Sequence, residues 1–251
     1  GMKTDYGKPF VLPEAGIFHP DADILFKDFN AYLDWYKKKE KFKKDSFWVG
    51  IHTNRSSSLK ESGKLEGHII TALEKEGINV LPIFGRPPYH KSLRTYFLDE
   101  KGHPRVDAVC GFSFRFLRGF PEETKQILAS INAPIFMPLE AHGITLDRWE
   151  KSDTGISTLR TAWQVCIPEQ NGGIEPTLVG GKTPVRLKGM TDVLYDRVAL
   201  PDQVDFLIKR IQAWYNLRRK PNHDKKIALL YWNHPPGKQN IGGSYMNCFR
   251  S

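Results

Sequence analysis

The sequence predicts an α/β domain in which a parallel sheet is flanked by helices. Short apolar runs rich in β-branched and aromatic residues recur along the first half of the chain, as expected of strands buried on both faces. Amphipathic segments with helical spacing lie between these runs, and the intervening loops are short. Strand and helix in alternation are the mark of βαβ units, which place their strands in one parallel sheet.

The first predicted element is a helix in the lead-in segment 1–46. Its apolar face is formed by five residues: Phe26, Phe29, Tyr32, Leu33 and Tyr36. The run 37–44 that follows holds six lysines and one glutamate. We interpret this run as a solvated helix end whose charge complements the helix dipole. A surface that attracts an acidic partner or ligand is the functional alternative.

The α/β domain is predicted to span residues 47–221. Its first four strands are expected at 47–52, 79–84, 106–112 and 134–137. Two helices are expected between them, one from Leu65 to a C-cap at Gly77 and one over about 122–131. A short helix at 145–152, an extended segment at 163–167 and a turn at 171–173 follow.

The strongest amphipathic pattern closes this domain. It comprises Val204, Leu207, Ile208, Ile211, Trp214 and Tyr215, and the helix is expected to end before Pro221. The run 226–232 is predicted to be a strand. Residues 222–251 would then be the first strand and Gly-rich turn of a further, truncated α/β unit.

Composition narrows the function classes. The chain has 251 residues, 40% of them hydrophobic, but no apolar run of the roughly 18–20 residues that span a bilayer. No secretory signal opens the chain, so a cytoplasmic location is expected. Three scattered cysteines without a CxxC pair argue against a disulfide framework and a structural zinc site. The net charge of +9 is not accompanied by a nucleic-acid-binding module, and no nucleic-acid partner is expected.

The predicted architecture resembles flavodoxin-like and periplasmic-binding-protein-like domains. Ligands of such open sheets bind beyond the carboxyl ends of the strands, near the point where strand order reverses. The residues at the predicted strand ends are His52, Thr53, Gly85, Arg86, Ser113, Glu140 and His142. A binding site is therefore expected among these side chains.

Two long strings carry a resemblance to a known family. Residues 168–176 read Pro-Glu-Gln-Asn-Gly-Gly-Ile-Glu-Pro, and 225–247 contain Pro-Pro-Gly-Lys-Gln-Asn-Ile-Gly-Gly. Between them lie Arg210, Trp214 and Leu217, and weaker echoes lie at 16–21 and 149–155. In this order they resemble the large subunit of tetrapyrrole metal chelatases, the CobN and magnesium chelatase H family. Gln170-Asn171 departs from the family's Leu-Asp, which puts a role for that aspartate in doubt here.

The resemblance implies ATP-dependent insertion of a divalent metal, cobalt or magnesium, into a tetrapyrrole. It also implies that separate AAA+ subunits hydrolyse the ATP. Large subunits of this family are several times longer than 251 residues, so the chain is expected to be one part of such a subunit and inactive alone. Consistent with this, Lys238 precedes the glycine pair at 242–243 and does not fit a phosphate-binding P-loop.

Three alternatives stay open. A related protein could remove metal from haem or another metallated tetrapyrrole, or this chain could be a non-catalytic tetrapyrrole-binding module. A sugar- or phosphate-binding domain would require the family resemblance to be misleading.

Metal insertion needs a base for the pyrrole protons, and imidazole or carboxylate suits that role. Glu140 and His142 are candidates because residues two apart on a strand share one side. His52 is a third catalytic candidate. Four further residues are candidates for tetrapyrrole binding: His19, Arg86, Glu169 and His234. No spacing such as HExxH indicates a resident metal site.

Overall fold

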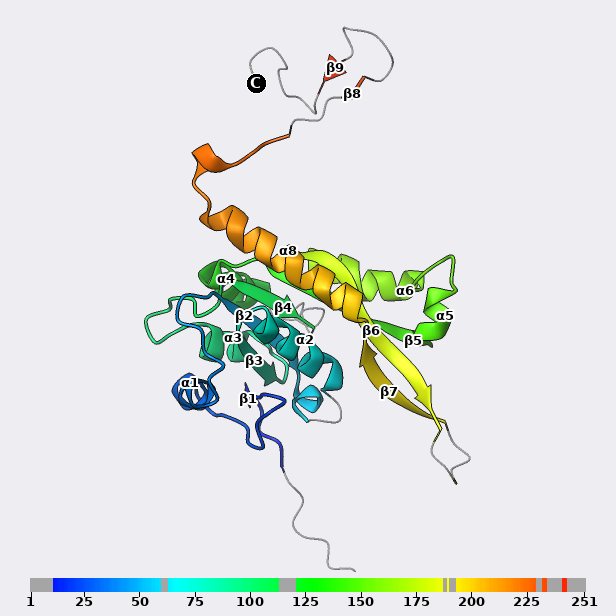
Figure 1. Ribbon diagram of the computed structural model, residues 1–251, viewed down its shortest axis with the longest axis horizontal. Coiled ribbons are helices and arrows are strands. Elements are labelled where there is room, and N and C mark those ends of the chain that lie inside the picture. The colour runs from blue at the N-terminus through cyan, green and yellow to red at the C-terminus, as the bar shows by residue number, and fades with distance from the viewer. Residues whose placement is uncertain are drawn as a thin grey trace, which may run out of the picture. The chain divides into compact units, whose positions relative to one another are not determined.

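A seven-stranded sheet organises the first of two compact units, 1–215 and 216–251 (Figure 1). The computed structural model describes residues 11–59, 63–112, 121–186, 189, 193–228, 232–233 and 241–242. The strands of the sheet are β1 (Gly16–Ile17), β2 (Trp48–Asn54), β3 (Asn79–Gly85), β4 (Ala108–Gly111), β5 (Ile135–Thr145), β6 (Gly173–Val185) and β7 (Leu194–Ala199). Their order is β1-β3-β2-β4-β5-β6-β7.

The α/β fold class is confirmed, but the sheet is mixed. The five central strands β3, β2, β4, β5 and β6 are parallel. The two edge strands are antiparallel, β1 to β3 and β7 to β6. Strand order reverses at β2, because β3 lies on one side of it and β4 on the other. A ligand crevice is therefore expected beyond the carboxyl ends of β2 and β4.

The helices of the first unit cover both faces of the sheet. They are α1 (Phe29–Lys38), α2 (Lys64–Lys75), α3 (His90–Phe97), α4 (Pro121–Ile131), α5 (Leu146–Glu150), α6 (Thr158–Thr161), α7 (Ile167–Glu169) and most of α8 (Pro201–Arg219). A 3₁₀-helix, η1 (Arg55–Ser58), follows β2, and a π-helical turn, η3 (Ala162–Cys166), joins α6 to α7. No described helix combines the length and apolarity needed to cross a membrane.

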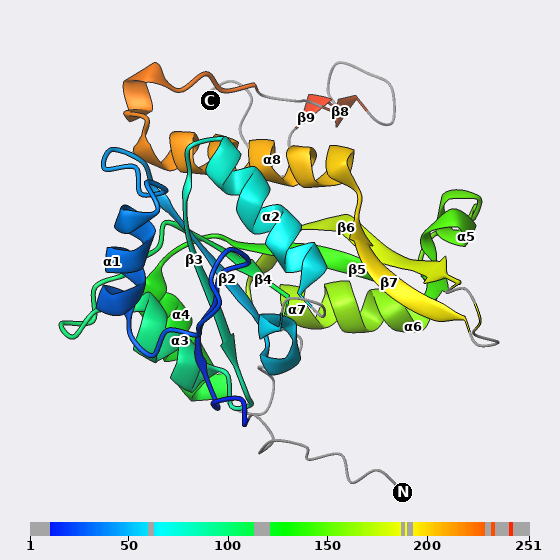
Figure 2. The same ribbon diagram turned by 60° about the horizontal axis from the view of Figure 1, so that its bottom comes forward.

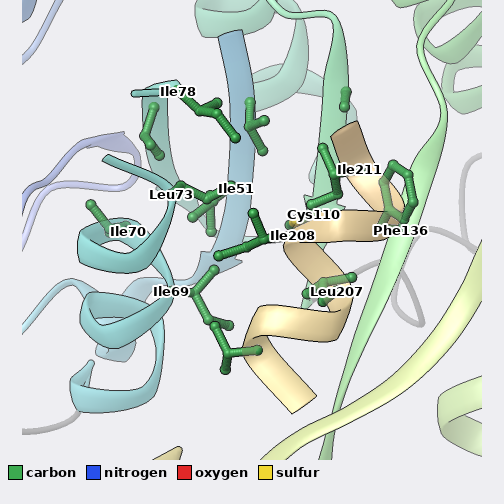
Figure 3. Close-up of a cluster of buried hydrophobic side chains, with 14 of the residues drawn as sticks. Ile51, Ile69, Ile70, Leu73, Ile78, Cys110, Phe136, Leu207, Ile208 and Ile211 are labelled. Atoms are coloured by element: carbon green, nitrogen blue, oxygen red, sulfur yellow. The ribbon is translucent and has the colours of Figure 1, made fainter. Parts of the chain in front are cut away.

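Two apolar cores hold these layers together. On one face, α2 and α8 pack against β2, β4 and β5 through the side chains shown in Figure 3. The aromatic ring of Tyr215 on α8 stacks on Phe47 at a centroid distance of 4.0 Å. On the other face lie α1, α3 and α4 (Figure 2). Their side chains form a second core that contains buried tyrosines. One of them, Tyr32, donates a hydrogen bond to the Val80 carbonyl, so its hydroxyl is satisfied inside the core.

Alternation along the buried strands explains why both faces are apolar. In β3, Val80 and Phe84 point into the core beneath α2, whereas Leu81 and Ile83 point into the core beneath α3. Every residue of β3 is buried, as expected of a parallel strand covered on both sides.

Several sequence predictions are corrected by the structure. The segment 163–167 is helical, in η3 and α7, because a short apolar run fits a helix as well as a strand. Three elements, α3, β6 and β7, were not predicted from the sequence. In the second unit, residues 226–228 are not in a strand and Trp232 belongs to β8 (Trp232–Asn233), whereas 229–231 of the predicted strand lie outside the described residues. This unit also contains the 3₁₀-helix η4 (Asn222–Asp224) and β9 (Ile241–Gly242), which pairs with β8.

Glu175 joins β6 to α8 and adopts a left-handed backbone conformation with φ of 53°. Its carboxylate accepts hydrogen bonds from the Arg210 Nε atom at 3.1 Å and the Trp214 Nε1 atom at 2.9 Å, and it also contacts Arg210 Nη2. The hydrogen bonds from Arg210 and Trp214 both lower the pKa of Glu175, and the one from Arg210 has the larger effect. Glu175 of the first string thus contacts Arg210 and Trp214, two of the residues that the family resemblance identified between the strings.

We expect Glu175→Ala to lower the free energy of unfolding by about 2 kcal/mol, because it removes hydrogen bonds to a charged group. Glu175→Gly removes the same bonds but relieves the left-handed strain. It should be less destabilising than the alanine variant by about 1 kcal/mol. Urea denaturation of both variants measures the difference, and equal losses would contradict the strain assignment.

Candidate functional site

A polar cavity of about 230 Å³ lies where the sheet topology predicts a ligand crevice. Asn54 lines it from the end of β2, and Phe112 lines it directly after β4. Glu140 and His142 enter it from β5, and Lys182 enters from β6. Side chains from four neighbouring parallel strands or strand ends therefore meet at the reversal point of the sheet.

Buried charges form the floor of this polar cavity. Arg197 of β7 lies between Glu140 and Glu66, with its Nη2 atom 2.8 Å from Glu140 Oε2 and its Nη1 atom 3.0 Å from Glu66 Oε2. The side chains of Glu66 and Glu140 are only 1% and 7% exposed. Glu66 also accepts a hydrogen bond from Thr53 Oγ1 at 2.8 Å.

The arrangement keeps Arg197 ionised. Burial by itself would lower the pKa of Arg197, but the hydrogen bond to Glu140 and the charges of Glu66 and Glu140 outweigh burial and raise it. One guanidinium is therefore the shared counter-charge of two buried carboxylates. Glu140 is held in a fixed orientation as a result, which is what an acid–base group requires.

Gln164 closes the polar cavity from η3. Its Oε1 atom accepts a long hydrogen bond from the Glu140 backbone N–H at 3.4 Å. Its Nε2 atom is buried and has no hydrogen-bond partner among the described residues. An unsatisfied amide donor at a cavity wall favours a ligand or solvent molecule that carries an acceptor oxygen.

The structure brings two of the three catalytic candidates together. His142 Nε2 lies 3.9 Å from Glu140 Oε2, and both side chains line the polar cavity. His52 lies apart from them in the core, where its Nε2 atom is 3.1 Å from Ser92 Oγ and its ring packs edge-on against Tyr89. Burial lowers the pKa of His52 to about 3, so its imidazole is neutral at physiological pH.

The tetrapyrrole-binding candidates do not converge on one site. Arg86 is exposed and pairs with Glu14, at 3.0 Å. Glu169 is exposed at the end of α7. His19 lines a different cavity, described next. His234 lies outside the described residues, as do Ser113 at a predicted strand end and Lys238 in the Gly-rich turn.

A second, larger cavity of about 1050 Å³ lies between the N-terminal segment and the start of α2. We call it the apolar cavity. Its walls come from residues 11–15, 18–27, 57–59 and 63–71, without every residue in each range taking part. Val11, Ile24 and Leu59 are large apolar side chains of this wall that remain exposed. Exposed apolar groups gathered around a hollow are typical of a binding surface.

Basic groups and η1 complete the apolar cavity. Lys27, Lys64 and His68 are exposed side chains of its lining. Arg55, the first residue of η1, holds the N-terminal wall in place by donating from Nε to the Pro13 carbonyl at 2.8 Å. Ser57 belongs to the lining of both cavities, so the polar and apolar cavities adjoin across η1.

Within the described residues, one group has the ligand types and spacing for a metal ion, namely His19, Asp21 and Glu74. Lys41 already fills this group, with its Nζ atom 2.8 Å from Asp21 Oδ2 and 2.6 Å from Glu74 Oε2. His19 Nδ1 accepts a hydrogen bond from the Asp21 backbone N–H. Nε2 therefore carries the ring proton and donates a hydrogen bond to Glu74 Oε1 at 2.9 Å. The group is therefore a satisfied ion-pair network.

Sequence reasoning missed the residues that fix Glu140. Glu66 lies on a helix face and Arg197 on a strand that was not predicted, 131 positions apart. Glu66 carries a usable signal, because it lies between Leu65 and Ile69 on the buried side of α2, where an unpaired carboxylate is costly. Nothing in the local sequence identifies Arg197 as its partner.

Comparisons with known proteins give consistent matches over the chain. A family model described as CobN/Magnesium Chelatase matches residues 1–251. The chloroplastic magnesium-chelatase subunit ChlH of Oryza sativa subsp. japonica is 31% identical over 267 aligned positions, which cover 100% of this chain and 18% of the relative. The aerobic cobaltochelatase subunit CobN of Sinorhizobium sp is 24% identical and is matched by 96% of this chain over 19% of its own length.

A solved structure shares the fold. The catalytic subunit of cobaltochelatase from Mycobacterium tuberculosis superposes with a TM-score of 0.61 at 20% sequence identity. The match covers 92% of this chain and 18% of that structure. This chain thus spans about a fifth of the length of the proteins it matches.

Proposed function

Because this chain belongs to the CobN/magnesium chelatase family, whose members include large subunits of metal chelatases, we propose that its first unit forms part of a tetrapyrrole-binding cleft. The complete subunit would insert a divalent metal, cobalt or magnesium, into the tetrapyrrole. Separate AAA+ subunits would supply ATP hydrolysis, and the remainder of the large subunit would complete the cleft. The family resemblance found in the sequence is confirmed by the whole-chain match.

The observation that carries this proposal is the apolar cavity beside the polar one. A volume of about 1050 Å³ is at the upper end of small-molecule sites, which suits a large, flat ligand. The exposed aliphatic side chains of the lining, Val11, Ile24 and Leu59, favour contact with the apolar faces of a macrocycle. Lys27, an exposed lysine of the lining, suits a carboxylate side chain of the macrocycle as a point charge.

The polar cavity would supply the proton chemistry. Metallation replaces two pyrrole N–H protons by bonds from nitrogen to a divalent ion, so two protons must leave the ring. Glu140, oriented by Arg197, is the proposed acceptor, and His142 is the proposed relay to solvent because it is 3.9 Å away and less buried than Glu140. Glu66 and Arg197 are positioning residues in this scheme, since they act through Glu140.

The cavity assignment predicts that this chain binds free-base porphyrin. Titration of protoporphyrin IX at micromolar concentrations is expected to shift its Soret band. Gly67→Phe places a ring in the apolar cavity, since a Cβ atom at Gly67 would meet only Pro20, at 3.4 Å or more. This variant should weaken binding about tenfold or more, which corresponds to about 1.4 kcal/mol.

Lys75→Phe is the matched control, because it adds the same ring to an exposed position of α2 outside both cavities. Equal binding by both variants would overturn the cavity assignment. The chain alone is expected to insert no metal, and insertion without partner subunits would contradict the proposal. Release of free porphyrin from haem by a complete subunit would instead support metal removal.

A further inference from the structure

One face of α2 presents an imidazole to the apolar cavity. Lys64, Gly67, His68 and Thr71 follow helical spacing and all line this cavity. His68 is exposed and makes no hydrogen bond or ion pair within the part of the chain that the structure describes. The other histidine of the lining, His19, has both ring nitrogens engaged, by Asp21 and Glu74. His68 is therefore the lining imidazole with a nitrogen available to a ligand.

The helix surface beside His68 is open to a flat group. Gly67 has no side chain, and only Pro20 lies within 4 Å of the place where its Cβ would be. A planar ligand can thus approach the backbone of α2 closely at this position. Neither feature is explained by packing, because His68 is exposed and a glycine inside a helix costs about 1 kcal/mol relative to alanine.

We propose that His68 is an axial ligand to the metal of a metallated tetrapyrrole held in the apolar cavity. The inference rests on the proposed function and extends it. A neutral imidazole donates a nitrogen lone pair to an open axial position of a macrocycle-bound ion, as histidine does for haem iron. A free-base macrocycle offers no ion and gains nothing from this bond. His68 would therefore distinguish the metallated product from the metal-free substrate.

The surroundings of His68 favour a role as a metal ligand over that of an ordinary exposed histidine. The aliphatic side chains of the rim exclude water from the face of a bound macrocycle, which strengthens a bond to the metal on that face. The nearest lining cation on the same helix, Lys64, is held by Asp196 at 3.1 Å, so its ammonium is directed toward β7. His68 is left as the nitrogen ligand that α2 offers to the cavity.

The test compares zinc protoporphyrin IX with free-base protoporphyrin IX on the whole chain at pH 8, by absorption spectroscopy. Wild type is expected to bind the zinc form at least about tenfold more tightly than His68→Ala does, a difference of about 1.4 kcal/mol. The zinc complex of wild type should show the Soret shift of a five-coordinate imidazole adduct. Free-base affinity should be the same for both chains. Added imidazole should restore the shift in the alanine variant.

His223→Ala is the control, because His223 is an exposed histidine that lines neither cavity. It should behave as wild type in every titration. If free-base porphyrin binds but the zinc complex lacks the imidazole-dependent shift, or His68→Ala leaves it unchanged, the axial-ligand proposal is overturned while the cavity assignment stands. If neither porphyrin binds, the cavity assignment itself fails.

Discussion

Replacing Arg197 with methionine is expected to lower the free energy of unfolding by about 3–5 kcal/mol at pH 7. The change leaves the carboxylates of Glu66 and Glu140 buried without a counter-charge, and breaking a buried ion pair by removing one partner typically costs this much. Methionine fills most of the volume of the arginine stem, so little of the loss would come from a void. Urea denaturation followed by circular dichroism measures the effect.

Two further variants separate the charge effect from packing. The triple change Glu66→Gln, Glu140→Gln and Arg197→Met removes all three charges and should recover much of the loss, because no buried charge is left unpaired. Lys182→Met, at an exposed lysine that lines the same cavity, should change stability by less than about 0.5 kcal/mol. A loss below 1 kcal/mol for the single Arg197 variant would show that the two carboxylates do not need it.

The stability of the first unit is expected to fall as the pH drops below about 6.5, the ordinary pKa of histidine. Burial lowers the pKa of His52 to about 3, so His52 stays neutral in the folded chain while the unfolded chain takes up a proton. The contribution of His52 is therefore complete above pH 6.5 and is lost progressively toward pH 3. The slope is about 1.4 kcal/mol per pH unit, which gives roughly 2 kcal/mol between pH 7 and pH 5.

The variant His52→Gln isolates the contribution of His52 to the pH dependence of stability. Glutamine does not titrate, so the difference in unfolding free energy between wild type and variant should shrink by roughly 2 kcal/mol from pH 7 to pH 5. Other histidines contribute equally to both proteins and cancel. A difference that is constant with pH would mean that His52 has the same pKa in the folded and the unfolded chain.

The parts of the fold that sequence predicts well are those whose burial is periodic. The strand at 47–52 and the helix carrying Val204, Leu207 and Ile211 were predicted because their apolar residues repeat with the spacing of a buried strand and a one-sided helix. In contrast, β6 was not predicted because it contains Pro176, Pro184 and the glycine pair Gly180-Gly181, and proline and glycine ordinarily interrupt strands.

The glycine pair of β6 has a packing reason that the sequence cannot show. A Cβ atom at Gly180 would lie 2.4 Å from the Val198 carbonyl oxygen and 2.6 Å from Leu65 Cδ1, and one at Gly181 would lie 2.7 Å from Leu146. The strand therefore passes too close to its neighbours for any side chain. Sequence propensity is overridden here by close approach of the backbone.

The candidate site was predicted in part. Glu140 and His142 were identified from their place at a strand end and their spacing, and the structure places both at one cavity. Their catalytic role stays a prediction. His52 satisfied the same positional argument but points into the core, because position along a strand end does not determine which face a side chain takes without the register of its neighbours.

The position of Ser57 in the lining of both cavities has a thermodynamic consequence. A ligand in one cavity that displaced the short turn Arg55–Ser58 would also reshape the adjacent cavity, so binding in the two would be linked. By linkage, any effect of a ligand in the apolar cavity on proton uptake at the polar cavity would equal the effect of that protonation on the dissociation constant of the ligand. Such linkage would appear as a dependence of the dissociation constant on pH.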